Sequence, residues 1–311
     1  MSGQRPTVVV CGYASVDYAM RLAPFEGPNA TTIVRSRADE WPRYGGVAHV
    51  TRAVSDVAAD RADVIALSWV GADAEGEAWR AAVRDGGASV AGVAVSGTRS
   101  PSSHLLYPEG LSTICLFDPA DCHPAELTES QQRVITGADV AVITVGPTEL
   151  TRAAVKALPA DRAIVWIVKH DPSALSPELV AELADRSRLI TLSSEESSYL
   201  EAIGKSARPG TYVARTAGAD GADLFVIATG GSLDHVGHVA TERVTGVDTT
   251  GAGDTFAGAL AVSLAADPHP DASEMLRHMT AAVEAATNML VARAGAAADE
   301  LDPQHQREKS R

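Results

Sequence analysis

Short apolar runs alternate with amphipathic stretches along most of the chain. The runs are rich in Val, Ile, Leu and Ala and are typical of buried strands; they lie at residues 7–10, 64–69, 140–145, 164–168, 189–192 and 224–228. Stretches such as 77–84 and 150–158 between them repeat their apolar residues with helical spacing. This alternation predicts an α/β fold in which helices flank a central, mostly parallel β-sheet.

Two segments interrupt the alternation. Residues 18–44 are rich in turn formers and contain a strand-like piece at 31–35, and residues 99–118 contain a strand-like pair at 104–107 and 113–117. Neither segment offers a crossover helix, so we predict that they form a small separate sheet over the main one. That sheet is either a lid that closes over a ligand or a plain β extension or dimer surface.

Composition limits the class of protein. The 311 residues, 45% hydrophobic and 21% charged, are sufficient for one large core, so we expect a single domain over 1–311 with a frayed polar tail at 297–311. The net charge of −14 argues against nucleic acid and membrane as partners. The first apolar stretch is too short for a signal peptide, which predicts a cytoplasmic protein. Three cysteines without CxxC spacing indicate neither a disulfide framework nor a zinc site.

The strongest chemical signal is the sequence VDTTGAGDTF at residues 247–256. A Gly-rich turn that opens a helix presents amides to an anion, here those of Gly251, Ala252 and Gly253, without any Lys or Arg. A carboxylate at Asp254 is unfavourable beside an anion unless it accepts a proton from an attacking nucleophile. The alternative is an ordinary helix start in which the dipole favours Asp254. Neither a P-loop motif nor a complete GxGxxG is present.

Several motifs together resemble the ribokinase-like (PfkB) family of carbohydrate kinases. The signature DTTGAGDTFAGA is preceded by Gly45-Gly46 before a helical run, and further matches, in the family's order, lie at 12–17, 71–76, 190–196 and 216–221. The resemblance extends from about residue 8 to about residue 296. It implies a parallel sheet flanked by helices, with a small β lid over the substrate.

The resemblance also implies a reaction, in which the γ-phosphoryl group of ATP moves to a hydroxyl of a sugar. Asp254 would be the base, and the amides of 251–253 would stabilise the charge that develops on the transferred group. A nucleoside kinase is an alternative, because Phe25, Trp41 or Tyr44 of the lid region would stack on a base; equally, these residues would belong to the core of the lid. A non-catalytic ligand sensor on the same fold is a third hypothesis. A homodimer through the lid is also expected.

For the substrate, the resemblance points to the end of the first strand and to the Gly-Gly turn. Asp17 would accept hydrogen bonds from substrate hydroxyls, although a strand-end turn former is the simpler alternative. Gly45 and Gly46 would allow close approach of the backbone, and Ser15 would add a hydroxyl. The family's substrate-contacting Asn aligns with Val50, or with His49 if one gap is allowed.

For the nucleotide and metals, the matching positions lie in the second half of the chain. Nucleotide contacts would come from Ser193, Thr216, Gly218 and Gly221. Apart from the resemblance, Lys169 follows the predicted strand 164–168, and ligands collect at the carboxyl ends of strands in open α/β sheets, so Lys169 is a candidate phosphate contact. Glu196 would hold a Mg²⁺-bound water or, alternatively, be a solvated helix-start residue. Some family members bind a monovalent cation such as K⁺, and the matching backbone carbonyls would belong to Asp248, Thr250, Arg293 and Gly295. A helix that simply ends at Gly295 would give the same pattern.

Overall fold

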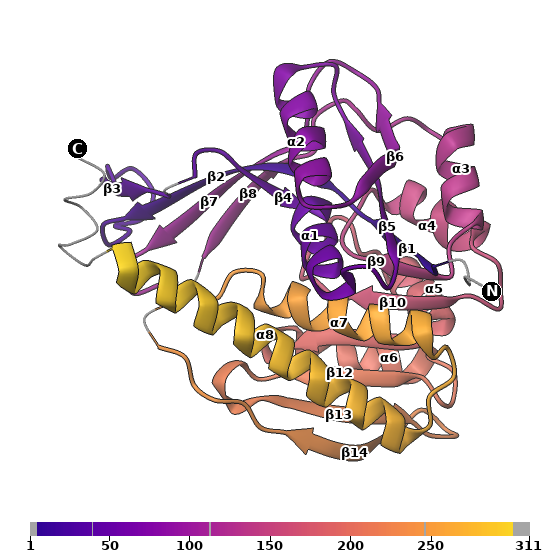
Figure 1. The fold of residues 1–311 in the computed structure, drawn as a ribbon. Coiled ribbons are helices and arrows are strands. Elements are labelled where there is room, and N and C mark those ends of the chain that lie inside the picture. The colour runs from indigo at the N-terminus through magenta and orange to yellow at the C-terminus, as the bar shows by residue number, and fades with distance from the viewer. Residues whose placement is uncertain (1–4, 39, 112, 246, 301–311) are drawn as a thin grey trace.

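The central element is a nine-stranded sheet in the order β14-β13-β12-β11-β10-β9-β1-β5-β6 (Figure 1). The computed structural model describes residues 5–38, 40–111, 113–245 and 247–300, with side chains to residue 295. All neighbouring strands pair in parallel except β12–β13 and β13–β14. The strands are β1 (Thr7–Cys11), β5 (Asp63–Val70), β6 (Ser89–Val95), β9 (Val140–Ile143), β10 (Ala163–Ile167), β11 (Leu189–Ser193), β12 (Tyr212–Thr216), β13 (Ala222–Ile227) and β14 (Leu233–Val239).

Helices cover both faces of this sheet, and successive strand residues alternate between the two cores. Val8 and Val10 of β1 lie in one core and Val9 and Cys11 in the other, as the two-residue period of a strand requires. The first core is closed by α1 (Val47–Ala58), α2 (Ala74–Asp85), α7 (Ala252–Ala266) and α8 (Ala272–Glu300). The second is closed by α3 (Glu129–Thr136), α4 (Thr148–Ala157), α5 (Pro177–Arg186) and α6 (Leu200–Ser206). The predicted α/β fold is confirmed.

A smaller sheet projects from the side of the molecule (Figure 1). Its strands are β2 (Ala14–Leu22), β3 (Val34–Arg37), β4 (Arg43–Gly46), β7 (Ser102–Pro108) and β8 (Ile114–Asp118). Their order is β3-β2-β7-β8, and β4 also pairs with β2. The predicted second sheet is therefore present, although β3 lies at Val34–Arg37 rather than 31–35, and β2 begins at Ala14, ahead of the predicted limit of residue 18. We call this sheet the lid.

Strands β6, β12 and β14 of the main sheet were not predicted, whereas the predicted strand at 224–228 corresponds to β13. Strand β14 has the sequence LDHVGHV and is mostly half-buried or exposed, so it lacks the continuous apolar run of a central strand. Strand β12 ends in Arg215 and Thr216, which interrupts its apolar pattern. β14 is an edge strand, which needs only one apolar face, whereas β12 lies inside the sheet and was missed because of its two polar residues.

The C-terminal helix is longer than the sequence indicates. Helix α8 continues through Gly295 to Glu300, so neither a helix end at Gly295 nor fraying from residue 297 fits these residues. The surrounding ARAGAAA is rich in Ala, the best helix former, which offsets the cost of one Gly. Residues 301–311 of the expected tail lie outside the described residues. Among the residues described, no helix is both long and apolar enough to cross a membrane.

Candidate active site

The Gly-rich turn lies directly before α7. Gly251 is the N-cap residue with φ of 86°, a left-handed conformation that favours glycine. The amide of Ala252 donates to the carbonyl oxygen of Thr249 at 3.1 Å, which closes a turn. Within the described part of the chain, the amides of Gly251 and Gly253 have no acceptor. Of the three expected anion-binding amides, these two are therefore the ones available to a ligand.

Asp254 lies in the first turn of α7 and faces a lysine. Its side chain is 14% exposed, and its Oδ1 is 3.4 Å from Nζ of Lys169, the second residue after β10. The negative charge of Asp254 raises the pKa of Lys169 against the effect of burial, and Glu196 adds to the increase. Lys169 is therefore protonated at neutral pH. Its charge interacts with the carboxylate of Asp254 in α7 and with that of Glu196, which follows β11.

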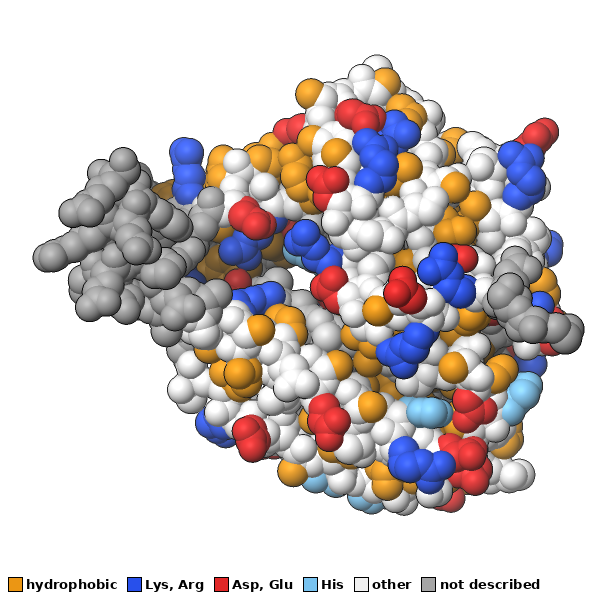
Figure 2. Space-filling view, in the orientation of Figure 1, with side chains coloured by type: hydrophobic (Ala, Val, Ile, Leu, Met, Phe, Trp, Pro, Cys, Tyr) orange, Lys and Arg blue, Asp and Glu red, His pale blue; other side chains and the backbone are white. Residues whose placement is uncertain are grey.

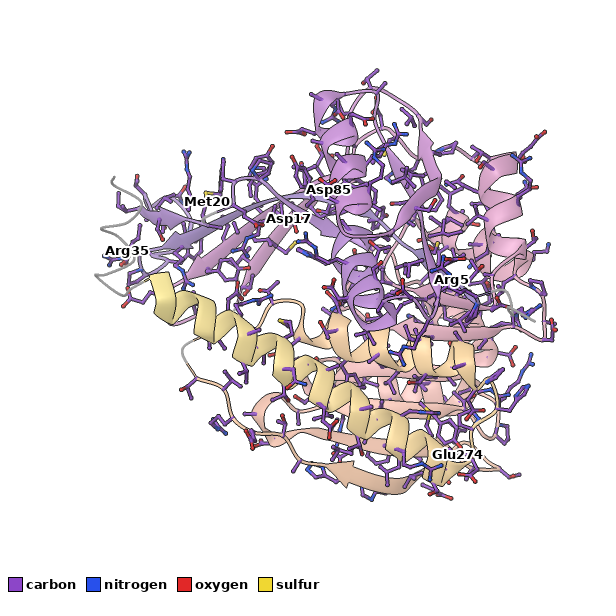
Figure 3. The ribbon with its side chains drawn as sticks, viewed as in Figure 1. Arg5, Asp17, Met20, Arg35, Asp85 and Glu274 are labelled. Atoms are coloured by element: carbon purple, nitrogen blue, oxygen red, sulfur yellow. The ribbon has the colours of Figure 1, made fainter. Side chains whose placement is uncertain are left out.

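Asp17 is held at the base of the lid. It is 8% exposed, accepts a hydrogen bond from Oγ of Ser15, and Ser15 in turn contacts Oγ of Ser103 at 2.8 Å. Burial raises the pKa of Asp17, and the hydroxyls of Ser15 and Ser103 and the neighbouring His49 and Arg43 oppose this rise. Ser15 thus orients Asp17, and its hydroxyl is already engaged. In Figure 3, Asp17 lies near the root of the lid, with Met20 and Arg35 toward the tip.

The Gly-Gly turn is shaped by its contacts. A Cβ on Gly45 would lie 1.9 Å from Oδ2 of Asp17, and a Cβ on Gly46 would lie 2.1 Å from the carbonyl oxygen of Tyr13. Gly46 also has a φ of 60°. A side chain at Gly45 would therefore displace the carboxylate of Asp17, so this glycine is required by its neighbour as well as by any ligand.

An ion pair joins the lid to the loop before α7. Arg43 of β4 lies opposite Asp17 in register, and its Nη1 is 3.4 Å from Oδ2 of Asp248. A cavity of about 310 Å³ under the lid is lined by Ala19, Arg21, Arg43, Tyr107 and Asp248, among others. Figure 2 shows the hollow between the lid and α8. Burial raises the pKa of Tyr107, and the negative charges of Asp248 and Asp17 add to the increase.

A second cavity, of about 460 Å³, continues from the lid toward α8. His49, Thr250, Gly251 and Arg293 are among its lining residues. Val50, in contrast, lies on the buried face of α1 and is 3% exposed. The ungapped interpretation, in which Val50 faces the substrate, is therefore wrong; His49 is the residue of this pair that faces open space.

The aromatic residues are arranged differently from the expectation. Trp41 packs edge-on against Tyr18 at 5.2 Å and beneath the guanidinium of Arg37 at 4.9 Å. Phe25 is 43% exposed, and Tyr44 packs against the core. Tyr107, which the sequence analysis did not single out, is the aromatic side chain that lines the cavity under the lid. The sequence held one signal for this position: in the predicted strand 104–107, alternate residues face the same side, which puts Tyr107 on one face with Leu105.

On the other side of the Gly-rich turn lies a cavity of about 520 Å³. All four expected nucleotide contacts line it: Ser193, Thr216, Gly218 and Gly221. Ala252 and Gly253 lie on the same wall, and Phe256, Val283 and Leu290 add apolar surface. The structure therefore brings the expected nucleotide residues together next to the anion-binding turn. Its volume and mixed lining suit a small organic ligand.

Glu196 is partly engaged by its own backbone. Its Oε2 accepts hydrogen bonds from the amide of Ser193 at 2.7 Å and from Oγ of Ser193 at 2.9 Å, and so caps the short helix η1 (Ser194–Tyr199). Its Oε1 has no such bond among the described residues. Within the same residues, no cluster of three or more His, Cys, Asp or Glu could hold a metal. One carboxylate fits Mg²⁺ that is held mainly by water and phosphate oxygens.

The residues expected to hold K⁺ do not fit that ion. Gly295 and Arg293 lie inside α8, where backbone carbonyls are used by the helix itself. The carbonyl oxygens of Asp248 and Thr250 instead accept hydrogen bonds from Nη1 of Arg293, at 2.5 and 2.9 Å. A side chain of this protein therefore lies where the expected cation would bind.

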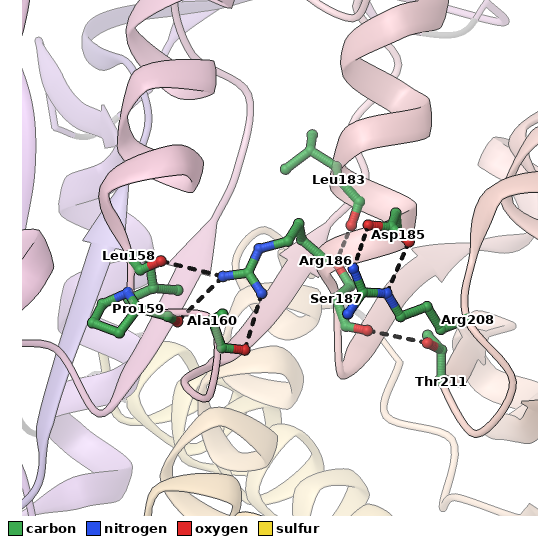
Figure 4. Close-up of polar contacts among 9 residues, drawn as sticks. All are labelled: Leu158, Pro159, Ala160, Leu183, Asp185, Arg186, Ser187, Arg208 and Thr211. Atoms are coloured by element: carbon green, nitrogen blue, oxygen red, sulfur yellow. Dashed lines mark hydrogen bonds and ion pairs between the residues drawn. The ribbon is translucent and has the colours of Figure 1, made fainter.

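A further cavity, at the opposite edge of the sheet, is lined by several arginines, and two of them are already hydrogen-bonded to protein groups. It has a volume of about 190 Å³. Arg186 donates to the carbonyl oxygens of Leu158, Pro159 and Ala160, and Arg208 pairs with Asp185 (Figure 4). These arginines satisfy the end of α4 and bridge α5 to β12, which is a structural role.

Comparison with known proteins decides the family. A model of the pfkB family carbohydrate kinases matches residues 7–302. The chain belongs to the pfkB family of carbohydrate kinases. The expected PfkB resemblance is thereby confirmed, and this pfkB protein is a kinase rather than the ligand sensor considered as an alternative. A search of curated protein sequences gives no significant match.

Solved structures with the same fold share little sequence with this pfkB kinase. The structure of ribokinase from Giardia lamblia matches with a TM-score of 0.73 at 15% identity, covering 92% of each chain. Arabidopsis thaliana ribokinase complexed with ribose and ATP matches at 0.68 and 19% identity, covering 91% of each. Methanocaldococcus jannaschii nucleoside kinase matches at 0.66 and 15%, covering 92% of this chain and 90% of that one. These similarities confirm the ribokinase fold.

Proposed function

We propose that this pfkB kinase transfers the γ-phosphoryl group of ATP to a hydroxyl of a sugar or sugar-like molecule, with Asp254 as the base. The observation that carries the proposal is the position of Asp254. It lies in the first turn of α7, whose preceding loop borders the cavity of the expected nucleotide residues on one side and the lid cavities on the other. A base at this junction can deprotonate an acceptor hydroxyl that faces the terminal phosphate.

Each side of the junction has groups suited to its ligand. ATP would occupy the cavity lined by Ser193, Thr216, Gly218 and Gly221, as ATP-bound plant ribokinase with the same fold supports. When bound, Mg²⁺ would neutralise phosphate charge, and Glu196 would hold one of its waters through Oε1. Asp17 would accept hydrogen bonds from the hydroxyls of the acceptor, held in place by Ser15 and Ser103.

In this proposal Lys169 pairs with Asp254 and stabilises the phosphoryl group during transfer. Its ammonium group is 3.4 Å from Oδ1 of Asp254 and its pKa responds to the charge of Glu196 as well. It therefore lies between the acceptor side and the nucleotide side, where the transferred phosphoryl group passes. We assign it to stabilise that group together with the amides of Gly251 and Gly253, which supply oriented dipoles.

A nucleoside acceptor is a second candidate. The observation that favours it is Tyr107, an aromatic side chain in the lid cavity that could stack on a base. The fold is also shared with the nucleoside kinase of Methanocaldococcus jannaschii. His49 can exchange hydrogen bonds with either class of acceptor, so it does not separate the two.

The test is a panel of free sugars, sugar derivatives and nucleosides, each assayed for formation of ADP and of the phosphorylated acceptor. We expect one class to be phosphorylated far faster than ATP is hydrolysed without acceptor. The same panel with Asp254→Asn provides the background, and Asp161→Asn, on the surface far from the turn, is the matched control. Phosphorylation that persists in Asp254→Asn would contradict the assigned base.

A further inference from the structure

The guanidinium of Arg293 contacts the back of the anion-binding loop. Nη1 donates to the carbonyl oxygens of both Asp248 and Thr250, which lie 45 and 43 residues before it in the chain. No carboxylate pairs with Arg293 among the residues the structure describes. Its positive charge is therefore directed at two backbone carbonyls rather than at an acidic side chain.

We propose that Arg293 takes the place of a bound monovalent cation, so that phosphoryl transfer by this protein needs no K⁺. Two carbonyl oxygens that converge on one point attract a cation, and a fixed guanidinium nitrogen occupies that point here. The backbone carbonyls of Arg293 and Gly295 cannot complete a cation cage, because both residues lie inside α8.

The contact also orients the anion-binding amides. In a trans peptide the C=O and N–H groups point in opposite directions. The carbonyl of Thr250 belongs to the same peptide unit as the amide of Gly251, so a cation on this carbonyl directs that N–H toward the opposite side. Charge at Arg293 therefore polarises the first amide of the turn toward the transferred phosphoryl group. Arg293 acts through the loop and is a positioning residue.

Asp248, which Arg293 contacts through its backbone, also contacts the lid through its side chain. The carboxylate of Asp248 pairs with Arg43 through Oδ2 and accepts hydrogen bonds from the amide and Oγ1 of Thr250 through Oδ1. The backbone of Asp248 is thus held by Arg293 while its side chain holds the lid. Asp248 links α8, the loop and β4, so the loop is fixed on both sides before a ligand arrives.

The first experiment measures cation binding without activity. Thermal unfolding is followed in KCl and in tetramethylammonium chloride at equal ionic strength, for the unmodified protein and for Arg293→Met. We expect no K⁺-specific rise in the melting temperature of the unmodified protein and a rise for the variant, whose two carbonyls are then open to the ion. Arg277→Met, an exposed position on the same helix, is the control. A K⁺-specific rise in the unmodified protein would overturn the proposal.

The second experiment rests on the proposed function and uses the best acceptor of the panel. Arg293→Met should lose about tenfold in kcat, less than the roughly hundredfold loss typical of a direct oxyanion donor. K⁺ should restore part of that loss, and Arg293→Lys should retain activity without K⁺. If the variant loses activity and neither binds K⁺ nor is rescued by it, the residue is merely structural. If no acceptor is found, the proposed function fails, whereas the melting experiment still decides this inference.

Discussion

Asp254 is the residue on which the chemistry depends. Asp254→Asn keeps the shape of the side chain and its place in α7 but cannot accept the proton of the acceptor. We expect kcat to fall at least about a hundredfold, the scale of general-base effects, with little change in the melting temperature. Steady-state kinetics on the best acceptor and thermal unfolding measure the two quantities. Near-normal turnover would exclude Asp254 as the base.

Lys169 and Asp254 form a pair whose members should not act independently. Lys169→Met leaves the carboxylate of Asp254 without its cation, so we expect a loss of kcat of about tenfold or more and lower stability. Adding Asp254→Asn should recover stability but not activity, which a double-mutant cycle measures. Lys205→Met, which removes an exposed lysine paired with Glu201, is the control. Additive stability effects would show that the 3.4 Å contact carries no energy.

Substitution of Asp17 should weaken binding of the acceptor but not of ATP. It lies on β2 at the base of the lid, whereas the expected nucleotide residues lie on the other side of the Gly-rich turn. Asp17→Ala should therefore weaken acceptor binding by about tenfold or more and leave ATP binding nearly unchanged, as expected when a buried charged hydrogen-bond partner is lost. Calorimetric titration of each ligand separately tests this. Equal losses for both ligands would refute the assignment.

At the scale of elements, the start of α2 is fixed by one carboxylate. Asp73 accepts hydrogen bonds from the amide of Gly76 at 2.7 Å and from the amide and Oγ of Ser100 at 2.8 and 2.6 Å. Burial favours the neutral acid, but these bonds outweigh it and lower the pKa of Asp73. The cap therefore ties α2 to the connection that leads into β7 of the lid.

Asp73→Ala should destabilise the protein by about 1 kcal/mol at neutral pH, the usual cost of an N-cap. Because the pKa of Asp73 is lower in the folded state, its contribution is complete above the unfolded value of about 4 and is lost as the pH falls through the folded value. Urea unfolding at several pH values should show the difference shrinking in acid. Asp85→Ala, at the other end of α2, should change stability little. A difference that stays constant in acid would contradict this account.

The lid is also the element most suited to self-association. Of the seven large hydrophobic side chains that are exposed among the described residues, five belong to the lid segments: Phe25, Ile33, Val34, Leu111 and Leu116. Val34 and Leu116 lie on the two edge strands of the lid, β3 and β8, and exposed apolar residues on an edge strand favour an interface. We propose a homodimer through the lid, in keeping with the expectation from sequence. The alternatives of a closing lid and a dimer surface are compatible.

Sedimentation velocity tests this proposal. The unmodified protein should sediment as a dimer, and Leu116→Asp on β8 should shift it to the monomer, because a buried charge at an interface is costly. Val95→Asp, which is equally exposed but lies on β6 of the main sheet, should leave the dimer intact. A protein that is monomeric at all concentrations would exclude the dimer.

At the scale of the whole molecule, continuous apolar runs and local glycine motifs determined the fold. Strands such as β1 and β9 are buried on both faces, so their sequences are continuous apolar runs that predict a strand directly. The turn before α7 requires a left-handed residue at position 251, which favours glycine whatever its neighbours are. The α/β class and the second sheet followed from these local patterns, whereas the expected nucleotide residues came from the resemblance to the pfkB family.

Contacts between distant segments decided the rest. Whether His49 or Val50 faces the cavity depends on how α1 packs on α7, and the ion pair of Lys169 with Asp254 joins residues that are far apart in sequence. The contacts of Arg293 with two carbonyl oxygens depend on how α8 packs beside the loop before α7, which no local pattern shows. Local sequence specifies backbone conformation, whereas side-chain partners depend on packing that brings separate elements together.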